Sequence, residues 1–120
     1  RGAKVAAYTV KPDYAIVLET TTACDFSGND GEKRVCELGR GCVVSYMDRS
    51  TIYDRELYRL GFEKAKEINV PCQTKTLVAG GNDSGAIHSS VGGIRTVALS
   101  VPCRYLHSTS CMIKKSDVHF

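Results

Sequence analysis

Three side chains that could bind a metal ion or transfer a proton stand near the ends of expected strands. Glu19 closes the first apolar run, Asp83 follows the glycine-rich turn after the third, and His107 lies just beyond the fourth. Sites in an open α/β sheet form beyond the carboxyl ends of its strands, so these groups could converge on one edge. Two carboxylates and an imidazole suit a hard or borderline divalent metal. Position alone still favours solvated acids, because most acids at strand ends face water.

The glycine-rich turn at 80–85 is a second candidate for chemistry. Its sequence, Gly-Gly-Asn-Asp-Ser-Gly, precedes a short expected helix, and backbone N–H groups at such a turn could hold an anion. The turn matches neither of the two common nucleotide-binding fingerprints. A tight turn in which Asp83 caps the helix is the favoured interpretation.

The remaining histidines and nucleophiles give weaker signals. The sequence lacks a Gly-x-Ser-x-Gly motif, which disfavours a serine hydrolase. We expect His88 to be a buried or interface histidine on a short helix, and His119 lies near the chain end. No Cys-x-x-Cys pair is present, so we expect neither a zinc ribbon nor a thioredoxin-type motif. At least two cysteines lie in or beside apolar runs and no secretion signal is visible, so we expect reduced thiols in a cytosolic protein rather than a disulfide framework. The six cysteines are Cys24, Cys36, Cys42, Cys72, Cys103 and Cys111.

The elements that would position these groups alternate between helix and strand, which predicts an α/β architecture. The run at 14–19 is continuous enough for a strand buried on both faces of a parallel sheet. Apolar residues at helical spacing predict an amphipathic helix that begins at Asp54, its N-cap. The expected elements are helix 3–10, strand 14–19, a long loop at 20–41, strand 42–47, helix 54–69, strand 73–78, a short helix from residue 86, and strand 96–101, ended by Pro102.

The composition limits the functional classes. The chain has 120 residues, of which 42% are hydrophobic and 24% charged, which is typical of one soluble globular domain. Its net charge is only +3 and its basic residues are scattered along the chain, which disfavours a nucleic-acid-binding surface. No apolar run approaches the roughly 20 residues of a membrane span. No apolar signal segment follows Arg1, and because the chain does not begin with Met, we expect its length not to be the natural one.

Five segments together, in order and at similar spacing, resemble peptidase family M42. Its members include glutamyl aminopeptidases and tetrahedral aminopeptidases, and they are often labelled endoglucanases. The resemblance covers nearly the whole chain and implies a zinc-peptidase-like mixed α/β sheet flanked by helices, here only the C-terminal half of that domain. The segments are Arg1-Gly2-Ala3-Lys4, Ala15-Ile16-Val17-Leu18-Glu19, Met47-Asp48-Arg49-Ser50, residues 80–88 and Arg104-Tyr105-Leu106-His107-Ser108.

The resemblance also implies a mechanism and a set of site residues. Two divalent metal ions, zinc or cobalt, would activate a water that attacks the peptide carbonyl beside the free amine of the substrate. Glu19 corresponds to the carboxylate that binds one ion, where many relatives have Asp, and His107 corresponds to the histidine that binds the other. The residues implied to line the substrate side and the specificity loop are Gly80, Gly81, Asp83, Thr21, Thr22 and Cys24.

The rest of the implied site is expected outside the chain. By the resemblance, the general base, the other metal ligands and a smaller inserted domain lie upstream of Arg1, and a final helix follows Phe120. We therefore expect residues 1–120 to be the C-terminal segment of a single catalytic domain, truncated at both ends. One ligand for each ion is fewer than the roughly three or four that zinc needs, so the chain alone should neither bind two ions tightly nor cleave peptides.

Two other functional classes stay open. A non-catalytic domain could reuse the same scaffold for binding, and a Glu-Glu pair encoded just before Arg1 would argue against it. A glycoside hydrolase needs two carboxylates flanking a sugar, which Glu19 and Asp83 could provide, although His107 would then have no role. For the peptidase, the resemblance implies peptide substrates and a homo-oligomer, dodecamer-like in the family, and the cysteine usage favours a cytoplasmic location.

Overall fold

The structure is a computed structural model that describes residues 2–28 and 33–118. Helices and strands alternate along these residues as the sequence predicts, with small differences in their bounds. The elements in chain order are α1 (Gly2–Val10), β1 (Tyr14–Thr22), β2 (Cys42–Val44), α2 (Arg55–Glu67), β3 (Cys72–Thr74), α3 (Ser84–His88), β4 (Arg95–Cys103) and the 3-10 helix η2 (Lys115–Val118).

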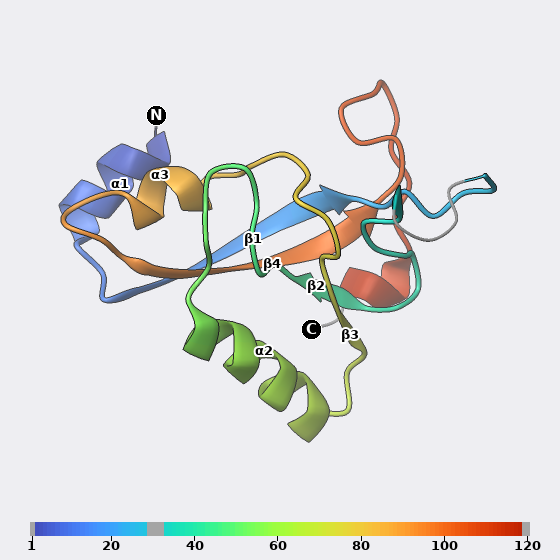
Figure 1. Cartoon of the computed structure of the whole chain (residues 1–120), viewed down its shortest axis with the longest axis horizontal. Helices are drawn as coiled ribbons and strands as arrows, with labels where there is room; N and C mark the ends of the chain where they lie inside the picture. The colour runs from blue at the N-terminus through green and yellow to red at the C-terminus, as the bar shows by residue number, and fades with distance from the viewer. Residues whose placement is uncertain (1, 29–32, 119–120) are drawn as a thin grey trace.

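The described strands form one mixed sheet in the order β1-β4-β2-β3 (Figure 1). β1 and β4 run parallel along their whole length, from the pair Tyr14 and Arg95 to the pair Thr22 and Cys103. β2 runs antiparallel to β4 and parallel to β3. This mixed sheet with flanking helices confirms the predicted α/β class. Because β1 and β4 are parallel neighbours, their carboxyl ends lie side by side at one edge of the sheet.

Helices cover the two faces of the sheet unequally. α1 and α3 pack against each other on one face, where α3 contacts both β1 and β4 (Figure 1). α2 lies on the other face and contacts β2 and β4. The side chains that β1 presents to that second face, Tyr14, Ile16 and Leu18, are exposed.

Helix α2 begins where the sequence predicts. The Asp54 side chain accepts hydrogen bonds from the backbone N–H groups of Glu56 and Leu57 at 3.0 and 2.9 Å, which confirms it as the N-cap. The helix ends at Glu67 with Ile68 as its C-cap, and Asn69 then turns the chain with a φ of 56°. Asparagine tolerates this left-handed conformation better than most residues, which explains the clean helix end.

The prediction that β1 is buried on both faces is wrong. Burial alternates along the strand: Val17 and Thr21 are buried, whereas Ile16 and Leu18 are exposed. The physical reason is its place at the edge of the described sheet, where a helix covers only one of its faces. The strand also continues to Thr22, three residues into the segment expected to be a loop.

Pro102 does not end β4, contrary to the prediction, because the strand continues to Cys103. The carbonyl of Ala98 bonds toward β2, and the carbonyl of Cys103 accepts a hydrogen bond from the Ala23 N–H on the β1 side. This alternation directs the nitrogen of Pro102 toward β2, whose pairing with β4 ends at Ser100. The missing N–H of proline therefore interrupts no ladder bond.

The strands β2 and β3 are shorter than the predicted strands 42–47 and 73–78. The chain leaves β2 after Val44 and turns back on itself, with Met47 and Ile52 forming an isolated antiparallel bridge. This excursion contacts the glycine-rich turn, since the Arg49 N–H donates to the carbonyl of Gly80.

The segment at 20–41 carries a small core of its own. Ala23, Val35 and Cys36 are buried against Val43 of β2. Buried Asp117 of η2 holds the end of this segment, since its carboxylate accepts the backbone N–H groups of Gly39 and Gly41 at 2.6 and 3.0 Å. All six cysteines are free thiols. Among the described residues, none of the helices has the length and apolar character needed to cross a membrane.

Candidate active site

A cleft of about 510 Å³ lies at the carboxyl ends of β1 and β4. Its walls come from the end of β1, from β4, from the turn that follows β4, and from the glycine-rich segment before α3. The residues that line it are Glu19, Thr20, Thr21, Thr22, Lys75, Ala79, Gly80, Gly81, Asn82, Asp83, Ser100, Leu106 and His107.

Strand register places Glu19 in the cleft. Glu19 pairs with Ser100 of β4, and alternation along β1 puts it on the same face as buried Val17. A side chain in a parallel strand pair has little freedom to change face, because a shift by one residue would reverse the whole strand. The carboxylate is half-buried at the mouth of the cleft.

A tight turn after β4 places His107. Arg104 and Met112 exchange backbone hydrogen bonds of 2.9 and 3.0 Å, which closes the base of the turn, and Ser108 N–H donates to the carbonyl of Tyr105 at 3.1 Å. His107 itself has a φ of 66°, in the left-handed region that favours glycine. A non-glycine residue persists there only when its surroundings hold it, and such residues cluster at functional sites.

An ion pair fixes this turn to the rest of the domain. The guanidinium of Arg104 donates to both oxygens of Asp25 at 2.6 and 3.1 Å, and Asp25 also accepts the backbone N–H of Leu38 at 2.9 Å. The hydrogen bond from Arg104 lowers the pKa of Asp25 and, with the Leu38 N–H, outweighs the opposite effect of burial. The side chain of Asp25 is only 6% exposed, so a charged carboxylate there anchors the turn that bears His107.

A buried hydrogen-bond cluster holds the glycine-rich turn from behind. The Tyr53 hydroxyl donates to the Asp48 carboxylate at 2.5 Å, and the Asn82 side-chain amide donates to the Tyr53 hydroxyl at 3.1 Å. The backbone N–H of Arg49 donates to the carbonyl of Gly80 at 2.8 Å. We call Asp48, Tyr53 and Asn82 the Asp48 cluster. It connects the excursion after β2 to one wall of the cleft.

Two glycines allow the turn to close onto this cluster. A Cβ at Gly81 would lie 2.7 Å from the Ser50 Oγ, and a Cβ at Gly85 would lie 2.7 Å from the Ser50 Cβ. Ser50 cannot easily move away, because its N–H and hydroxyl donate to Asp48 at 2.8 and 3.1 Å. Any side chain at Gly85 would therefore push the turn away from its support.

Burial and hydrogen bonding perturb the titrating groups near this wall. Burial raises the pKa of Asp48, but hydrogen bonds from Tyr53 and Ser50 together lower it by more, so the net pKa lies below its usual value. Burial and the bond to Asp48 raise the pKa of Tyr53 to about 12. Burial lowers the pKa of Lys75, whose amine donates to the carbonyl of Ala79 at 2.6 Å inside the cleft. The cleft thus combines two carboxylates, an imidazole and an amine.

All of the site residues expected from the sequence line this cleft except Cys24. Cys24 packs instead against the small core formed by Ala23, Val35, Cys36 and Val43.

Asp83 occupies the N-cap position of α3, as predicted, but its side chain does not act as a cap. Asp83 already has helical backbone angles and makes no side-chain cap hydrogen bond. The Asn82 side-chain oxygen accepts the Ser84 N–H at 2.8 Å instead. His88 is half-buried on α3 outside the cleft, and His119 lies outside the described residues.

Sequence reasoning missed the Asp48 cluster and Lys75. The Asp-x-Ser spacing at 48–50 is a local turn signal, because an Asp side chain often accepts the N–H two residues on. Nothing local links that turn to Tyr53 and Asn82, which meet only through the tertiary fold.

The side chains at the cleft have donor atoms suited to a divalent metal, but there are too few of them to form a complete metal site. A carboxylate oxygen and an imidazole nitrogen both bind zinc and cobalt, and Glu19 and His107 offer one of each. Across residues 2–28 and 33–118, no group of three His, Cys, Asp or Glu side chains lies close enough to hold an ion.

Comparison with known proteins gives the family of the chain. The family model for the M42 glutamyl aminopeptidases matches residues 1–119. A protein of Acetivibrio thermocellus, provisionally named an aminopeptidase, is 40% identical over 121 residues, which cover 99% of this chain and 36% of that protein.

Solved structures give the same family. A TET aminopeptidase from the marine sediment archaeon Thaumarchaeota archaeon SCGC AB-539-E09 has a TM-score of 0.92 and 32% identity over 98% of this chain and 33% of its own. The TET1 peptidase of Pyrococcus horikoshii, which can assemble into a tetrahedron or a large octahedral shell, has a TM-score of 0.74 and 33% identity over 93% of this chain and 31% of its own. The chain spans about a third of the length of the proteins it matches. It belongs to the M42 glutamyl aminopeptidase family.

Proposed function

We propose that this chain is part of an aminopeptidase that removes N-terminal residues from peptides with the help of two divalent metal ions, zinc or cobalt. The observation that supports the proposal most directly is the convergence of Glu19 and His107, from distant parts of the sequence, on one cleft at the ends of adjacent parallel strands. Membership of the family and the names of the relatives support the class of reaction.

In this proposal Glu19 binds one ion and His107 binds the other. The remaining ligands and the general base belong to the parts of the full-length protein outside this chain. When bound, the ions would polarise the scissile carbonyl and lower the pKa of a water molecule. The chain's own contribution is positional: strand register holds Glu19, and the turn anchored by Arg104 and Asp25 holds His107.

The substrate would lie along the glycine-rich wall. Gly80 and Gly81 present backbone without side chains there, so a peptide can approach closely. The carboxylate of Asp83 is exposed and makes no capping hydrogen bond to α3. It is therefore suited to pair with the cationic amine of a peptide N-terminus. Thr21 and Thr22 line the opposite side, where they would contact the first side chain of the peptide.

We also propose a cytoplasmic homo-oligomer. The shells formed by the Pyrococcus horikoshii peptidase support the assembly, and six free cysteines without a disulfide support a reducing compartment.

Metal content and turnover test the proposal in the full-length protein. Glu19→Gln and His107→Asn should each lower kcat for aminoacyl-p-nitroanilides by about 100-fold or more, which corresponds to losing several kcal/mol of electrostatic stabilisation. Each variant should also lose about one equivalent of metal by elemental analysis, because it removes a ligand from a different ion. The matched control is His88→Asn, a histidine outside the cleft, which should keep both metal and activity.

Three results would count against the proposal. Variants that retain both ions and full turnover would remove Glu19 and His107 from the site. Hydrolysis by the purified 120-residue chain would contradict the assignment of the general base to the rest of the protein. Release of sugar from carboxymethyl cellulose that depends on Glu19 and Asp83 would support the glycoside hydrolase class instead.

A further inference from the structure

Two thiols meet at the base of the turn that carries His107. Cys103 is the last residue of β4 and is fully buried, whereas Cys111 lies on the returning arm of the turn and is exposed. The two thiols are within hydrogen-bonding distance of each other. Neither of them lines the candidate active site.

The backbone at the base of this turn directs both thiols to one side. Arg104 and Met112 exchange backbone hydrogen bonds of 2.9 and 3.0 Å, and each cysteine directly precedes one of these two residues. Side chains alternate in direction along paired extended segments, so the neighbours of a directly opposed pair share the other face. Cys111 belongs to no strand, so its backbone can make the small movement that brings two thiols in contact to the roughly 2 Å of a disulfide bond.

The two thiols differ in their access to dissolved reagents. Burial raises the pKa of the Cys103 thiol, and the hydrogen bond with Cys111 raises it further. The Cys103 thiol also donates to the carbonyl of Arg104 at 3.3 Å. A buried thiol of this kind is shielded from reagents, so exposed Cys111 reacts first. An accessible cysteine beside a second one that can resolve its oxidised form is typical of redox-active pairs.

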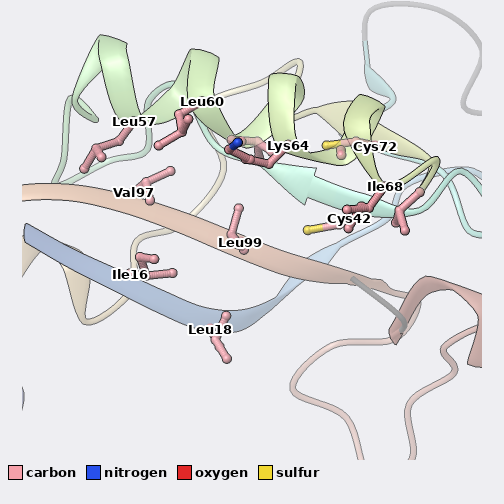
Figure 2. A pocket seen from close by; sticks show the side chains of 14 residues that line it. Ile16, Leu18, Cys42, Leu57, Leu60, Lys64, Ile68, Cys72, Val97 and Leu99 are labelled. Carbon is pink, nitrogen blue, oxygen red and sulfur yellow. The ribbon is translucent and has the colours of Figure 1, made fainter.

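The other four thiols lack this combination of access and contact. All six cysteines lie within the described residues, and Cys111 alone is exposed. Cys42 and Cys72 are register partners on β2 and β3, but their sulfur atoms lie apart and do not point toward each other (Figure 2). Burial raises the pKa of Cys42 to about 12. Cys36 is buried in the small core of the 20–41 segment, and Cys24 packs against that core.

We propose that Cys103 and Cys111 form a reversible disulfide by exchange with a low-molecular-weight disulfide such as oxidised glutathione. The Cys111 thiolate attacks one sulfur of the reagent, forms a mixed disulfide and releases one glutathione thiolate. The Cys103 thiol loses its proton to solvent, and its sulfur then attacks the Cys111 sulfur and releases the second glutathione thiolate. The two cysteine protons balance the two thiolates, so one disulfide replaces another. Excess reduced glutathione reverses both steps.

The disulfide acts on the turn that holds His107. His107 lies midway between the two cysteines, four residues from each, and has the left-handed φ of 66°. Closing the bond draws the two arms of the turn together at their base, which displaces the imidazole from the position that it has with free thiols. The consequence for catalysis, unlike the disulfide itself, rests on the proposed function, in which His107 binds one of the two ions.

Peptide mapping of the full-length protein tests the pair directly. The reduced protein is incubated with excess oxidised glutathione, the remaining thiols are blocked with N-ethylmaleimide, and the protein is digested with trypsin. Trypsin cleaves after Arg95, Arg104 and Lys114, so the two cysteines lie on separate peptides, 96–104 and 105–114. Mass spectrometry of the digest should show these two peptides joined by a disulfide in most of the protein.

Three variants define what the map should show. Cys111→Ser should form no link, and because Cys111 is exposed, this substitution leaves the fold intact. Cys103→Ala should keep one glutathione on Cys111, since the sulfur that resolves the mixed disulfide is missing. Cys72→Ser is the matched control, because it removes a thiol outside the turn and the cleft, and it should form the link as the parent does.

Two results of the map would overturn the proposal. A glutathione adduct that persists on Cys111 of the parent protein would show that Cys103 cannot reach it. A link from Cys111 to a second copy, seen as a dimer on a non-reducing gel, would assign the exposed thiol to a contact between molecules instead.

Turnover of an aminoacyl-p-nitroanilide measures the consequence for His107. Oxidation should lower the turnover of the parent protein by about 10-fold or more, as expected for disturbing the support of a metal ligand, and dithiothreitol should restore it. Cys111→Ser should be insensitive to both reagents. A link that leaves turnover unchanged would overturn the effect on His107. Failure of the proposed function would appear instead as reduced protein without turnover, and the peptide map would still report the disulfide.

Discussion

Removing the Tyr53 hydroxyl should weaken the support of the cleft in a way that depends on pH. That hydroxyl donates to the Asp48 carboxylate at 2.5 Å and accepts from the Asn82 amide at 3.1 Å. A hydrogen bond to a charged acceptor contributes about 1.5–3 kcal/mol and a neutral one about 0.5–1.5 kcal/mol. Tyr53→Phe leaves the buried ring in place, so we expect a loss of about 2–4.5 kcal/mol in the free energy of unfolding at pH 7.

The sign of the pH dependence follows from the pKa of Asp48. Burial raises that pKa, but the bonds from Tyr53 and Ser50 lower it below the ordinary value of 3.8 in the folded state. A carboxyl whose folded pKa is lowered stabilises the fold above its unfolded pKa, and this stability is lost as the pH falls through the folded value. The loss caused by Tyr53→Phe should therefore be constant above about pH 5 and shrink below pH 3.8.

Urea denaturation followed by circular dichroism measures this difference across the pH range. Tyr58→Phe is the matched control, because the Tyr58 hydroxyl donates to the neutral Thr74 hydroxyl at 2.8 Å. It removes the same atom without touching a carboxylate, so we expect a loss of about 0.5–1.5 kcal/mol that does not change with pH. A Tyr53→Phe loss no larger than that of Tyr58→Phe, or one that stays constant into acid, would refute the assignment of a charged acceptor at Asp48.

Three further substitutions test other supports of the site. Gly85→Ala should cost about 1–3 kcal/mol in urea denaturation because its Cβ meets Ser50, and adding Ser50→Gly should recover part of that loss rather than add to it. Asp117→Ala should cost about 2–5 kcal/mol in the same assay, since it leaves two backbone N–H groups without an acceptor, and an unchanged midpoint would contradict this. Arg104→Gln should raise the pKa of Asp25 in a titration followed by NMR, so the variant should lose stability at a higher pH than the parent chain as acid is added.

The parts of the fold that could be predicted are those fixed by local pattern. The apolar spacing and the cap at Asp54 locate α2 because both signals lie within one helix. The convergence of Glu19 and His107 was also predictable, since the carboxyl ends of parallel neighbouring strands must meet at one edge. The positions of these two residues near the ends of predicted strands were sufficient to predict that their side chains meet, but these positions do not identify a metal.

The parts that could not be predicted depend on contacts between distant segments. The Asp48 cluster needs Tyr53 and Asn82 to meet, and only the tertiary fold brings them together. Pro102 is tolerated because β2 has stopped pairing at Ser100, which no local rule about proline reveals. The exposed face of β1 was missed for a related reason: a continuous apolar run predicts burial on both faces, whereas within the described residues only one face of this edge strand is covered.

The two proposed ligand positions differ in how firmly this chain alone can hold them. Glu19 sits within a strand pair, and any movement of its backbone would break ladder bonds on one side of β1. His107 sits at the tip of a turn whose left-handed backbone depends on the Arg104–Met112 bridge and on the ion pair with Asp25. Breaking that ion pair should therefore displace the imidazole and leave the carboxylate in place. If the two groups serve different ions, loss of Asp25 weakens the affinity for one ion while the other keeps its ligand.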